Sequence, residues 1–344
     1  MARTASKSRA AIEKRKDDHL RLALTDDQIG NEVRWWDVVT LPHCALPEMA
    51  LDDVKLRVKY PCGALGFPLM VLGMTGGTAQ AARANQAVAR VCARLGLPMG
   101  LGSMRPWFES GGRSAGYALR APGLRLYGNV GGTQLAKWHG AGELARVRDS
   151  VDALRLAAFC VHLNPAQELM QPEGDRDFRG VLAAIEALVA LLPIPVIVKE
   201  TGAGISPAVA RSLWAAAVRW IDISGSGGTS WTQIENARSD NPMAMFDQWG
   251  IPAPQALAAC VAGAPGPHYI ASGGIRHGLD VVRALSMGAR MAGIARPVLS
   301  AWEAGGEVAV EDYLKQVMHQ ARVATLLTGC CCAGDLAKLG VRVG

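Results

Sequence analysis

The chain has 344 residues, of which 50% are hydrophobic and 19% are charged. This composition excludes an intrinsically disordered chain and allows one large domain or two ordinary ones. The formal net charge is +6, and residues 1–16 alone carry six Lys and Arg residues. The basic surplus therefore belongs to an N-terminal arm and does not predict a nucleic-acid-binding face.

The longest apolar run, residues 181–198, contains Glu186, Pro193 and Pro195, so it predicts a buried helix followed by a strand and no membrane span. The arm lacks the apolar stretch of a secretory signal, and a solvated terminus and a transit peptide both fit it. The eight cysteines show no paired metal-ligand spacing, and a disulfide within the run 330–332 would be strained. We expect a soluble, cytoplasmic protein with free thiols.

Residues 1–67 precede the first predicted barrel strand, and we expect them to form an extension of helices and a hairpin that covers the barrel. From Pro68 onward, short β-rich apolar runs alternate with helical stretches, which predicts parallel strands joined by helices. The strands are expected at Leu69–Met74, Pro98–Ser103, Leu124–Asn129, Ala158–Leu163, Pro195–Glu200, Arg219–Ser224, His268–Ser272 and Arg290–Ala295. Eight such strands predict a closed (β/α)₈ barrel over residues 68–344.

An open, doubly wound sheet is the alternative architecture. Its dinucleotide fingerprint would place G-x-G-x-x-G after the first strand, where this chain reads Met74-Thr75-Gly76-Gly77-Thr78. The barrel is therefore favoured, and in a barrel the active groups lie at the carboxyl ends of the strands.

Two basic segments are candidates for binding a diphosphate. Arg15, Lys16 and His19 lie within about one helical turn, and Arg105 follows the second strand. Arg105 would supply bidentate hydrogen bonds to a phosphate. A solvated basic helix is the alternative for the first group.

The fourth strand is followed by a dense group of polar residues. His162-Leu163-Asn164-Pro165-Ala166-Gln167-Glu168 holds an imidazole, two amides and a carboxylate, and the segment Gln171 to Asp175 follows. Polar groups this dense at a barrel mouth favour a polar ligand over satisfied surface residues. Glu168, without a His or Cys cluster, suits a Mg²⁺ ion held mainly by substrate oxygens.

Lys199 closes the fifth strand, and a lysine directed into a barrel mouth is costly unless it meets an anion or an electron-rich ring. We therefore expect it to face the N1/O2 edge of a flavin. A salt bridge to Glu200 is the alternative, although neighbours in a strand point to opposite faces. The glycine-rich stretch from Ser224 to Trp231 ends the sixth strand, and it indicates either close ligand contact or a flexible loop. Residues 235–252 are expected to form a long loop that acts as a lid.

Paired glycines follow the seventh strand, in Ser272-Gly273-Gly274-Ile275-Arg276, and Gly293-Ile294-Ala295-Arg296 ends the eighth. Glycine lets the backbone approach an anion closely and direct N–H groups at it. Phosphate is commonly bound after the seventh and eighth strands of such barrels, so this pair of turns predicts a phosphate site.

Together these motifs closely resemble the type 2 isopentenyl-diphosphate delta-isomerases, over residues 15 to about 300. The order and number of the motifs carry the resemblance, and the stretch from Asn164 to Asp175 is its most specific part. Its motifs are Arg15-Lys16-x-x-His19, Met74-Thr75-Gly76-Gly77, His162-x-Asn164-x-x-Gln167-Glu168, Gln171-Pro172-Glu173-Gly174-Asp175, Val198-Lys199-Glu200, Ser224 to Trp231 and Ser272-Gly273-Gly274.

The resemblance implies a barrel enzyme that isomerises isopentenyl diphosphate to dimethylallyl diphosphate with reduced FMN as acid and base. It implies Mg²⁺ bound by Glu168, NAD(P)H as the reductant of the flavin, and a homo-oligomer of four or eight chains. It implies an FMN site formed by Met74, Thr75, Gly76, Ser103, Asn129, Lys199, Ser224, Thr229, Gly273, Gly274, Ile275, Arg276, Gly293, Ala295 and Arg296. It implies substrate contacts from Arg15, Lys16, His19, Arg105, His162, Asn164 and Gln167, the last three being the candidate catalytic residues.

Two features depart from the family pattern. Met104 stands where the family usually has Gln, which removes an amide that we expect beside the substrate. The run Cys330, Cys331 and Cys332 is also foreign to the family.

Two other functions are considered. An FMN-dependent 2-hydroxy-acid oxidase or dehydrogenase would carry a Ser-His-His-Gly-Gly segment, where this chain reads Ser224-Gly225-Ser226-Gly227-Gly228 without histidine. The second alternative is a barrel that binds flavin or diphosphate but has lost turnover. Met104 is the only feature of the sequence that supports it.

Overall fold

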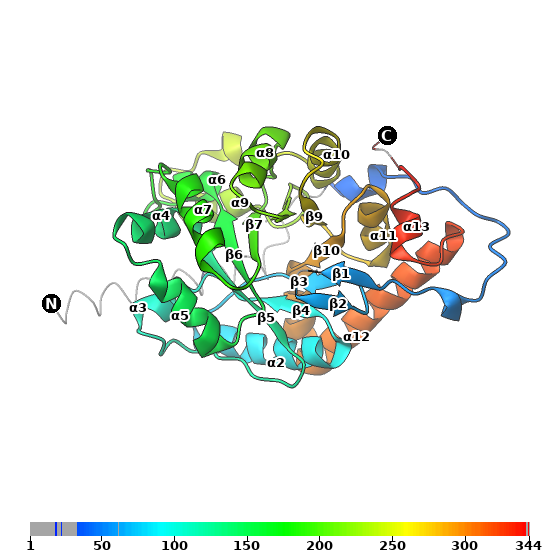
Figure 1. Ribbon diagram of the computed structural model, residues 1–344, viewed down its shortest axis with the longest axis horizontal. Coiled ribbons are helices and arrows are strands. Elements are labelled where there is room, and N and C mark those ends of the chain that lie inside the picture. The colour runs from blue at the N-terminus through cyan, green and yellow to red at the C-terminus, as the bar shows by residue number, and fades with distance from the viewer. Residues whose placement is uncertain (1–17, 19–21, 23–32, 61, 342, 344) are drawn as a thin grey trace.

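The computed structural model describes residues 18, 22, 33–60, 62–341 and 343. The predicted barrel is confirmed, because eight parallel strands close in the order β10-β3-β4-β5-β6-β7-β8-β9 (Figure 1). The strands are β3 (Leu69–Val71), β4 (Pro98–Gly100), β5 (Arg125–Gly131), β6 (Ala158–Leu163), β7 (Val196–Glu200), β8 (Trp220–Asp222), β9 (His268–Ala271) and β10 (Met291–Ile294). Each overlaps one of the predicted strands, although most bounds differ by one to three residues.

Helices follow the strands and surround the barrel. They are α2 (Ala79–Leu95), α3 (Arg105–Glu109), α4 (Gly132–Gly140), α5 (Ala145–Leu154), α6 (Pro165–Met170), α7 (Val181–Leu191), α8 (Pro207–Ala215), α9 (Trp231–Arg238), α10 (Ala253–Gly263), α11 (Gly278–Ser286), α12 (Arg296–Leu327) and α13 (Ala333–Leu336). Local sequence sets several helix ends. Thr78 accepts a hydrogen bond from the N–H of Ala81 at the start of α2, and Gly96 ends that helix in the left-handed conformation.

A hairpin closes one end of the barrel. Strands β1 (Val58–Tyr60) and β2 (Gly63–Leu65) pair antiparallel, and Tyr60 and Leu65 belong to a buried apolar cluster that includes the first residues of β6, β8 and β10. The ring of Tyr60 lies edge-on to Trp220 at 4.6 Å and stacks with Tyr127 at 5.8 Å. The hairpin therefore covers the amino ends of the strands, opposite the end where the chemistry is expected.

The described part of the N-terminal segment runs over the outside of the barrel. It contains two short 3₁₀ helices, η1 (Trp35–Val38) and η2 (Leu51–Asp53). The N–H of Cys44 donates to the carbonyl of Leu327 at 2.7 Å, and the N–H of Lys55 donates to that of Cys331 at 2.8 Å. The division at residue 67 stays a prediction, and Arg15, Lys16 and His19 lie outside the described residues.

The predicted loop over residues 235–252 differs from the structure at its start. Helix α9 continues to Arg238, and a third 3₁₀ helix, η3 (Ala244–Phe246), lies within the loop. The side chains of Thr232, Glu235 and Asn236 are buried, and this packing extends the helix beyond what the polar composition suggested.

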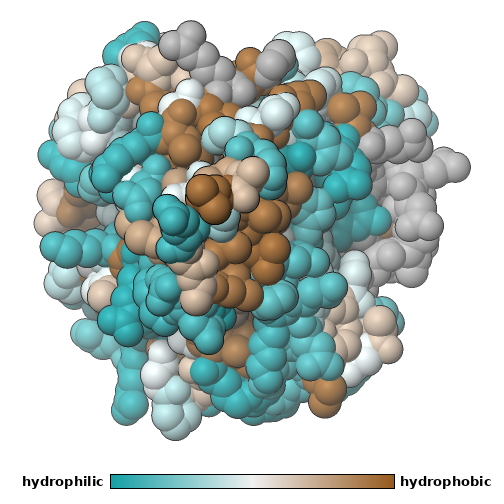
Figure 2. Space-filling view, turned by 90° about the vertical axis from the view of Figure 1, so that its right-hand side faces the viewer, coloured by the Kyte–Doolittle hydropathy of each residue, from teal (hydrophilic) through white to brown (hydrophobic). Residues whose placement is uncertain are grey.

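None of the helices in the described part of the chain is long and apolar enough to span a membrane. Figure 2 shows the side of the molecule that lies at the right of Figure 1, where α12 and α13 are found. Apolar residues gather at its centre within a hydrophilic border.

Candidate active site

A cavity of about 600 Å³ opens at the carboxyl ends of the barrel strands. Every predicted site residue that the structure describes lines it. They are Met74, Thr75, Gly76, Ser103, Arg105, Asn129, His162, Asn164, Gln167, Glu168, Lys199, Ser224, Thr229, Gly273, Gly274, Ile275, Arg276, Gly293, Ala295 and Arg296. The structure thus brings into one cavity residues that are up to 222 positions apart, from Met74 to Arg296, while their individual roles stay predictions.

The turn after β9 has room only for glycine at two positions. Gly273 and Gly274 have φ of +92° and +81°, and a Cβ atom at these positions would lie 1.9 Å from the Gly225 carbonyl oxygen and 2.5 Å from that of Gly227. The two glycine-rich turns after β8 and β9 are therefore in direct backbone contact. Arg276 strengthens this contact by donating from Nη2 to the carbonyl of Gly227 at 3.0 Å.

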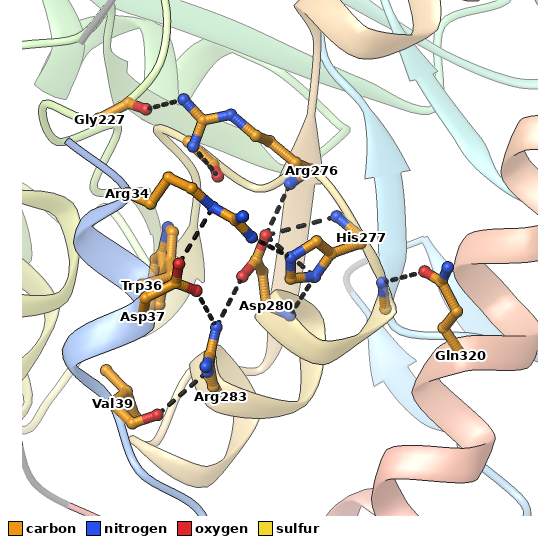
Figure 3. A network of polar contacts seen from close by, with 12 residues as sticks. Arg34, Trp36, Asp37, Val39, Gly227, Arg276, His277, Asp280, Arg283 and Gln320 are labelled. Atoms are coloured by element: carbon orange, nitrogen blue, oxygen red, sulfur yellow. Dashed lines mark hydrogen bonds and ion pairs between the residues drawn. The ribbon is translucent and has the colours of Figure 1, made fainter. Parts of the chain in front are cut away.

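A polar network fixes the same turn from outside (Figure 3). The indole N–H of Trp36 in η1 donates to the carbonyl of Gly273 at 2.8 Å. Asp280 of α11 accepts from the backbone N–H of Arg276 at 2.9 Å and forms an ion pair with Arg283 at 3.3 Å. Arg283 also pairs with Asp37 at 2.6 Å, so η1 and α11 hold the turn between them (Figure 3).

Positive charge collects beside this turn. Burial lowers the pKa of Arg276, the carboxylates Asp280 and Asp37 oppose that shift, and the cations Arg34 and Arg296 add to the lowering. Close cations that repel one another are stabilised by an anion. The backbone turns and these guanidinium groups therefore form a site suited to a phosphate.

Lys199 and Asp222 are buried neighbours on adjacent strands, with Lys199 lining the cavity and Asp222 beneath it. They are paired neighbours in the register of β7 and β8, and their exposed fractions are 8% and 1%. Asp222 Oδ1 accepts from Ser272 Oγ at 2.5 Å, whereas Oδ2 is buried without a hydrogen-bond partner among the described residues. Burial raises the pKa of Asp222 to about 6, and the charge of Lys199 opposes the shift.

The alternative salt bridge between Lys199 and Glu200 is absent from the described part of the chain. Lys199 Nζ donates instead to the backbone carbonyl of Glu200 at 3.1 Å. The Glu200 carboxylate points to the other face of the strand and accepts backbone N–H groups from the following turn, including that of Thr201 at 2.6 Å. Lys199 is therefore available to the cavity, which it lines.

At the rim of the cavity, after β6, hydrogen bonds hold Gln167 at both ends of its amide. Its Oε1 accepts from Asn164 Nδ2 at 3.1 Å, and its Nε2 donates to Glu235 Oε1 at 3.0 Å. Glu235 is fully buried and pairs with Arg238, which also reaches Glu173 at 3.2 Å. A buried carboxylate can only accept, so Glu235 fixes which end of the Gln167 amide donates.

His162 and Glu168 are fixed at the same rim. His162 Nδ1 lies 2.9 Å from Asn129 Oδ1. Glu168 Oε1 accepts from Asn164 Nδ2 at 3.1 Å, and Oε2 accepts from the backbone N–H of Asp175 at 2.8 Å. A Cβ atom on Gly174 would lie 2.0 Å from the Glu168 carbonyl oxygen, so only glycine lets this loop fold back onto Glu168.

Arg105 begins α3 at the cavity edge and pairs with Glu109 at 2.6 Å. Met104 does not lie at the edge of the cavity, where it was expected beside the substrate. Its side chain is 0% exposed, does not line the cavity and accepts the backbone N–H of Asn129 at 3.3 Å through sulfur. Met104 immediately precedes α3 and is directed into the core. Its identity therefore affects the packing beneath Asn129 directly, and a ligand only through that packing.

Sequence reasoning missed Asp222 and Glu235. Asp222 lies two residues before Ser224 in an otherwise apolar strand, and that lone carboxylate was the available signal. Glu235 follows Ile234 near the middle of a short helix, and nothing local distinguishes it from a solvated carboxylate. Only the tertiary contact with Gln167 identifies it.

Comparisons with known proteins identify the family of this chain. A family model described as FMN-dependent dehydrogenase matches residues 162–342, just over half of the chain. The isopentenyl-diphosphate delta-isomerase of Stutzerimonas stutzeri is 41% identical to this chain over 341 residues, and the matched region covers 96% of each protein. The chain belongs to the isopentenyl-diphosphate delta-isomerase family. The protein of the same name from Cronobacter sakazakii is 40% identical, with 92% of this chain and 93% of that protein covered.

Solved structures with the same fold include a mandelate oxidase, with a TM-score of 0.62, 20% identity and 98% of each chain covered. A mandelate oxidase variant with an FMN adduct has a TM-score of 0.63 and 18% identity, with 94% of this chain and 95% of that chain covered. At this identity the likeness shows the barrel alone. Membership of the isomerase family confirms the resemblance drawn from the sequence motifs.

Proposed function

We propose that this isomerase-family chain converts isopentenyl diphosphate to dimethylallyl diphosphate with FMN as its cofactor. The observation that supports this most is the cavity itself, which joins an end suited to a phosphate to a rim of amides, an imidazole and a carboxylate. The reaction moves a double bond, so it needs one proton added and one removed, without net oxidation.

The residues present fit FMN. The turns at Gly273 and Gly293, with Arg276 and Arg296, suit its phosphate, and Lys199 above the buried Asp222 offers a cation to one edge of its ring. The other proposed contacts are Met74, Thr75, Gly76, Ser103, Asn129, Ser224, Thr229, Gly274, Ile275 and Ala295. Reduced FMN, when bound, would supply the acid and the base that an alkene requires.

The rim residues would bind and orient the substrate. Arg105 would contact the diphosphate, while His162 and Asn164 present hydrogen-bonding groups over the cavity. Gln167 is held at both ends of its amide, so it would position the substrate or relay a proton, because an amide is too weak an acid or base to act alone.

The basic arm with Arg15, Lys16 and His19 would complete the diphosphate site. Leu22, which follows these residues in sequence, is buried against Ile234 of α9 beside Trp231, a residue that lines the cavity. The chain just after the arm therefore contacts the wall of the site.

Mg²⁺ would bind Glu168 together with diphosphate oxygens and water. One carboxylate without soft ligands nearby fits this hard ion. NAD(P)H would reduce the flavin before the first turnover without being consumed in each cycle. A cytoplasmic location and a tetramer or octamer belong to the same proposal, and the apolar area in Figure 2 is a surface on which copies of the chain would meet.

A hydroxy-acid oxidase is the other candidate, because the barrel is shared with mandelate oxidases. Such an enzyme needs a histidine base beside an arginine. Among the described residues that line the cavity, His162 is the only histidine, and it lies on β6 with its Nδ1 2.9 Å from Asn129 Oδ1. The site therefore favours isomerisation.

The test is proton NMR of isopentenyl diphosphate incubated in D₂O with the protein, FMN, Mg²⁺ and dithionite, against an air-oxidised control. The proposal expects dimethylallyl diphosphate with incorporated deuterium in the reduced sample only. No conversion by a protein shown to hold FMN would reject the isomerase activity, and turnover of a 2-hydroxy acid would support the oxidase.

A further inference from the structure

A second group of chemically reactive side chains lies outside the cavity, at the turn between α12 and α13. The ligand atoms of Cys331, Cys332 and Asp335 all lie within 4.8 Å of one another. The third cysteine of the run, Cys330, is buried and directs its thiol toward the carbonyl of Thr328. The run therefore presents two thiols, and not three, to a common point.

Their spacing matches the coordination shell of a small cation. Cys331 Sγ and Cys332 Sγ donate to the same carboxylate oxygen, Asp335 Oδ2, at 3.4 and 3.1 Å. Zinc binds sulfur at about 2.3 Å and carboxylate oxygen at about 2.0–2.2 Å, so tetrahedral geometry places a sulfur about 3.6 Å from the oxygen and the two sulfurs about 3.8 Å apart. The two sulfur–oxygen distances therefore lie within about half an ångström of the value that a bound zinc ion requires.

Neighbouring groups hold these ligands in place. Lys338 Nζ binds the other oxygen of Asp335, Oδ1, at 3.2 Å, which leaves Oδ2 directed at the thiols. The backbone of Cys331 is fixed by the N–H of Lys55 at 2.8 Å, and the carbonyl of Cys332 accepts the N–H of Asp335 at 3.2 Å. Outer contacts of this kind orient metal ligands.

We propose that Cys331, Cys332 and Asp335 form a binding site for a thiophilic divalent cation of the zinc type, with the remaining coordination position open to water. Two thiolates and one carboxylate select such a cation over Mg²⁺. Binding transfers the two thiol protons to solvent. Cys331 is exposed, so the ion reaches the site directly from solvent.

The site connects two distant parts of the chain. Residues 331 and 332 pair with Lys55, which follows η2 of the N-terminal segment. A bound ion therefore stabilises the turn that holds this segment against the C-terminal helices. This inference does not depend on the proposed isomerase activity, since none of the three ligands lines the cavity.

The experiment is a titration of the fully reduced, FMN-loaded protein with Cd²⁺, followed by the ultraviolet absorbance of cadmium–thiolate bonds. Zn²⁺ is then added in competition. The proposal expects one Cd²⁺ per chain, displaced by Zn²⁺ and unaffected by millimolar Mg²⁺. Cys331→Ser and Cys332→Ser should each abolish the absorbance band, and Asp335→Asn should weaken binding at least tenfold.

Cys44→Ser is the matched control, because Cys44 is another partly exposed thiol that lies outside the cluster. Its binding curve should match that of the unchanged protein. Flavin content shows that each variant is folded. An unchanged band in the Cys331→Ser and Cys332→Ser variants, or no saturable band in the unchanged protein, would overturn the site.

Discussion

The two ends of the barrel are built from the same strands but carry opposite chemistry. At the amino ends, Tyr60 of the hairpin packs against Trp220 and Tyr127, and the interior is apolar and closed. At the carboxyl ends, Lys199 lines an open polar cavity and its neighbour Asp222 lies in the layer beneath it. The transition is short, since Trp220 and Asp222 are two residues apart in β8.

Residues i and i+2 of a strand face the same side and lie about 6.6 Å apart. Along the interior face of β8, the aromatic ring of Trp220 is therefore followed directly by the buried carboxylate of Asp222. The closed end consists of packed apolar side chains and the open end of polar groups. Substitutions at the closed end should therefore lower stability, and those at the open end should lower activity.

The largest effect is expected at the closed end. Trp220→Ala removes a ring that is 7% exposed and packed edge-on against Tyr60, so the free energy of unfolding should fall by about 3–5 kcal/mol. Urea denaturation measures this loss. At a temperature where the variant is still folded, FMN affinity and turnover per folded chain should stay within about twofold. A large loss of turnover would contradict the separation of the two ends.

At the open end, Gln167→Ala should do the reverse. The side chain bridges Asn164 and Glu235, and its loss should lower kcat about 100-fold while FMN stays bound and stability changes little. Steady-state kinetics and flavin absorbance measure the two quantities. Gln248→Ala, an exposed amide that does not line this cavity, is the control. Unchanged kcat would remove Gln167 from the mechanism.

Asp222 lies between the two ends and sharpens the comparison through its pH dependence. Its pKa is raised to about 6 by burial, so its protonated form is favoured in the folded chain. The stability that this gives is complete below about pH 4 and is lost as pH rises through about 6. Between about pH 4 and pH 7, the unchanged protein should lose on the order of 2 kcal/mol relative to Asp222→Asn.

Denaturation of both proteins at a series of pH values measures that difference. Ser272→Ala serves as the companion variant, because it removes the hydrogen bond to Asp222 Oδ1 without removing the carboxylate. It should keep the pH dependence. Parallel stability curves for the Asp222→Asn variant and the unchanged protein would show that Asp222 does not titrate in this range.

The sequence predicted the open end better than the closed end. Each barrel strand ends in glycine or a polar residue or is followed by one within two positions, so the cavity lining could be predicted from strand order alone, as with Lys199 and Gly273. The position of the hairpin could not, because an antiparallel pair has no local signal for which end it covers. The role of Glu235 and the inward direction of Met104 depend on tertiary packing. Glu235 contacts Gln167, 68 positions away, and Met104 contacts Asn129, 25 positions away.

The smallest effect is expected where the outer network supports the open end. Arg283→Ala removes the ion pair with Asp37 and the bond to the Val39 carbonyl at 3.0 Å, which loosens η1 against the turn at Gly273. FMN affinity should fall about tenfold, which corresponds to about 1.4 kcal/mol, because the turn is less ordered before binding. Flavin fluorescence titration measures it.

Arg94→Ala is the matched control for this effect. Arg94 forms comparable ion pairs with Glu307 and Glu311, but these join α2 to α12 and contact no residue of the cavity turns. Its FMN affinity should equal that of the unchanged protein. If Arg283→Ala and Arg94→Ala bind FMN equally well, η1 does not order the turn, and the open end is held by its glycine-rich backbone contacts alone.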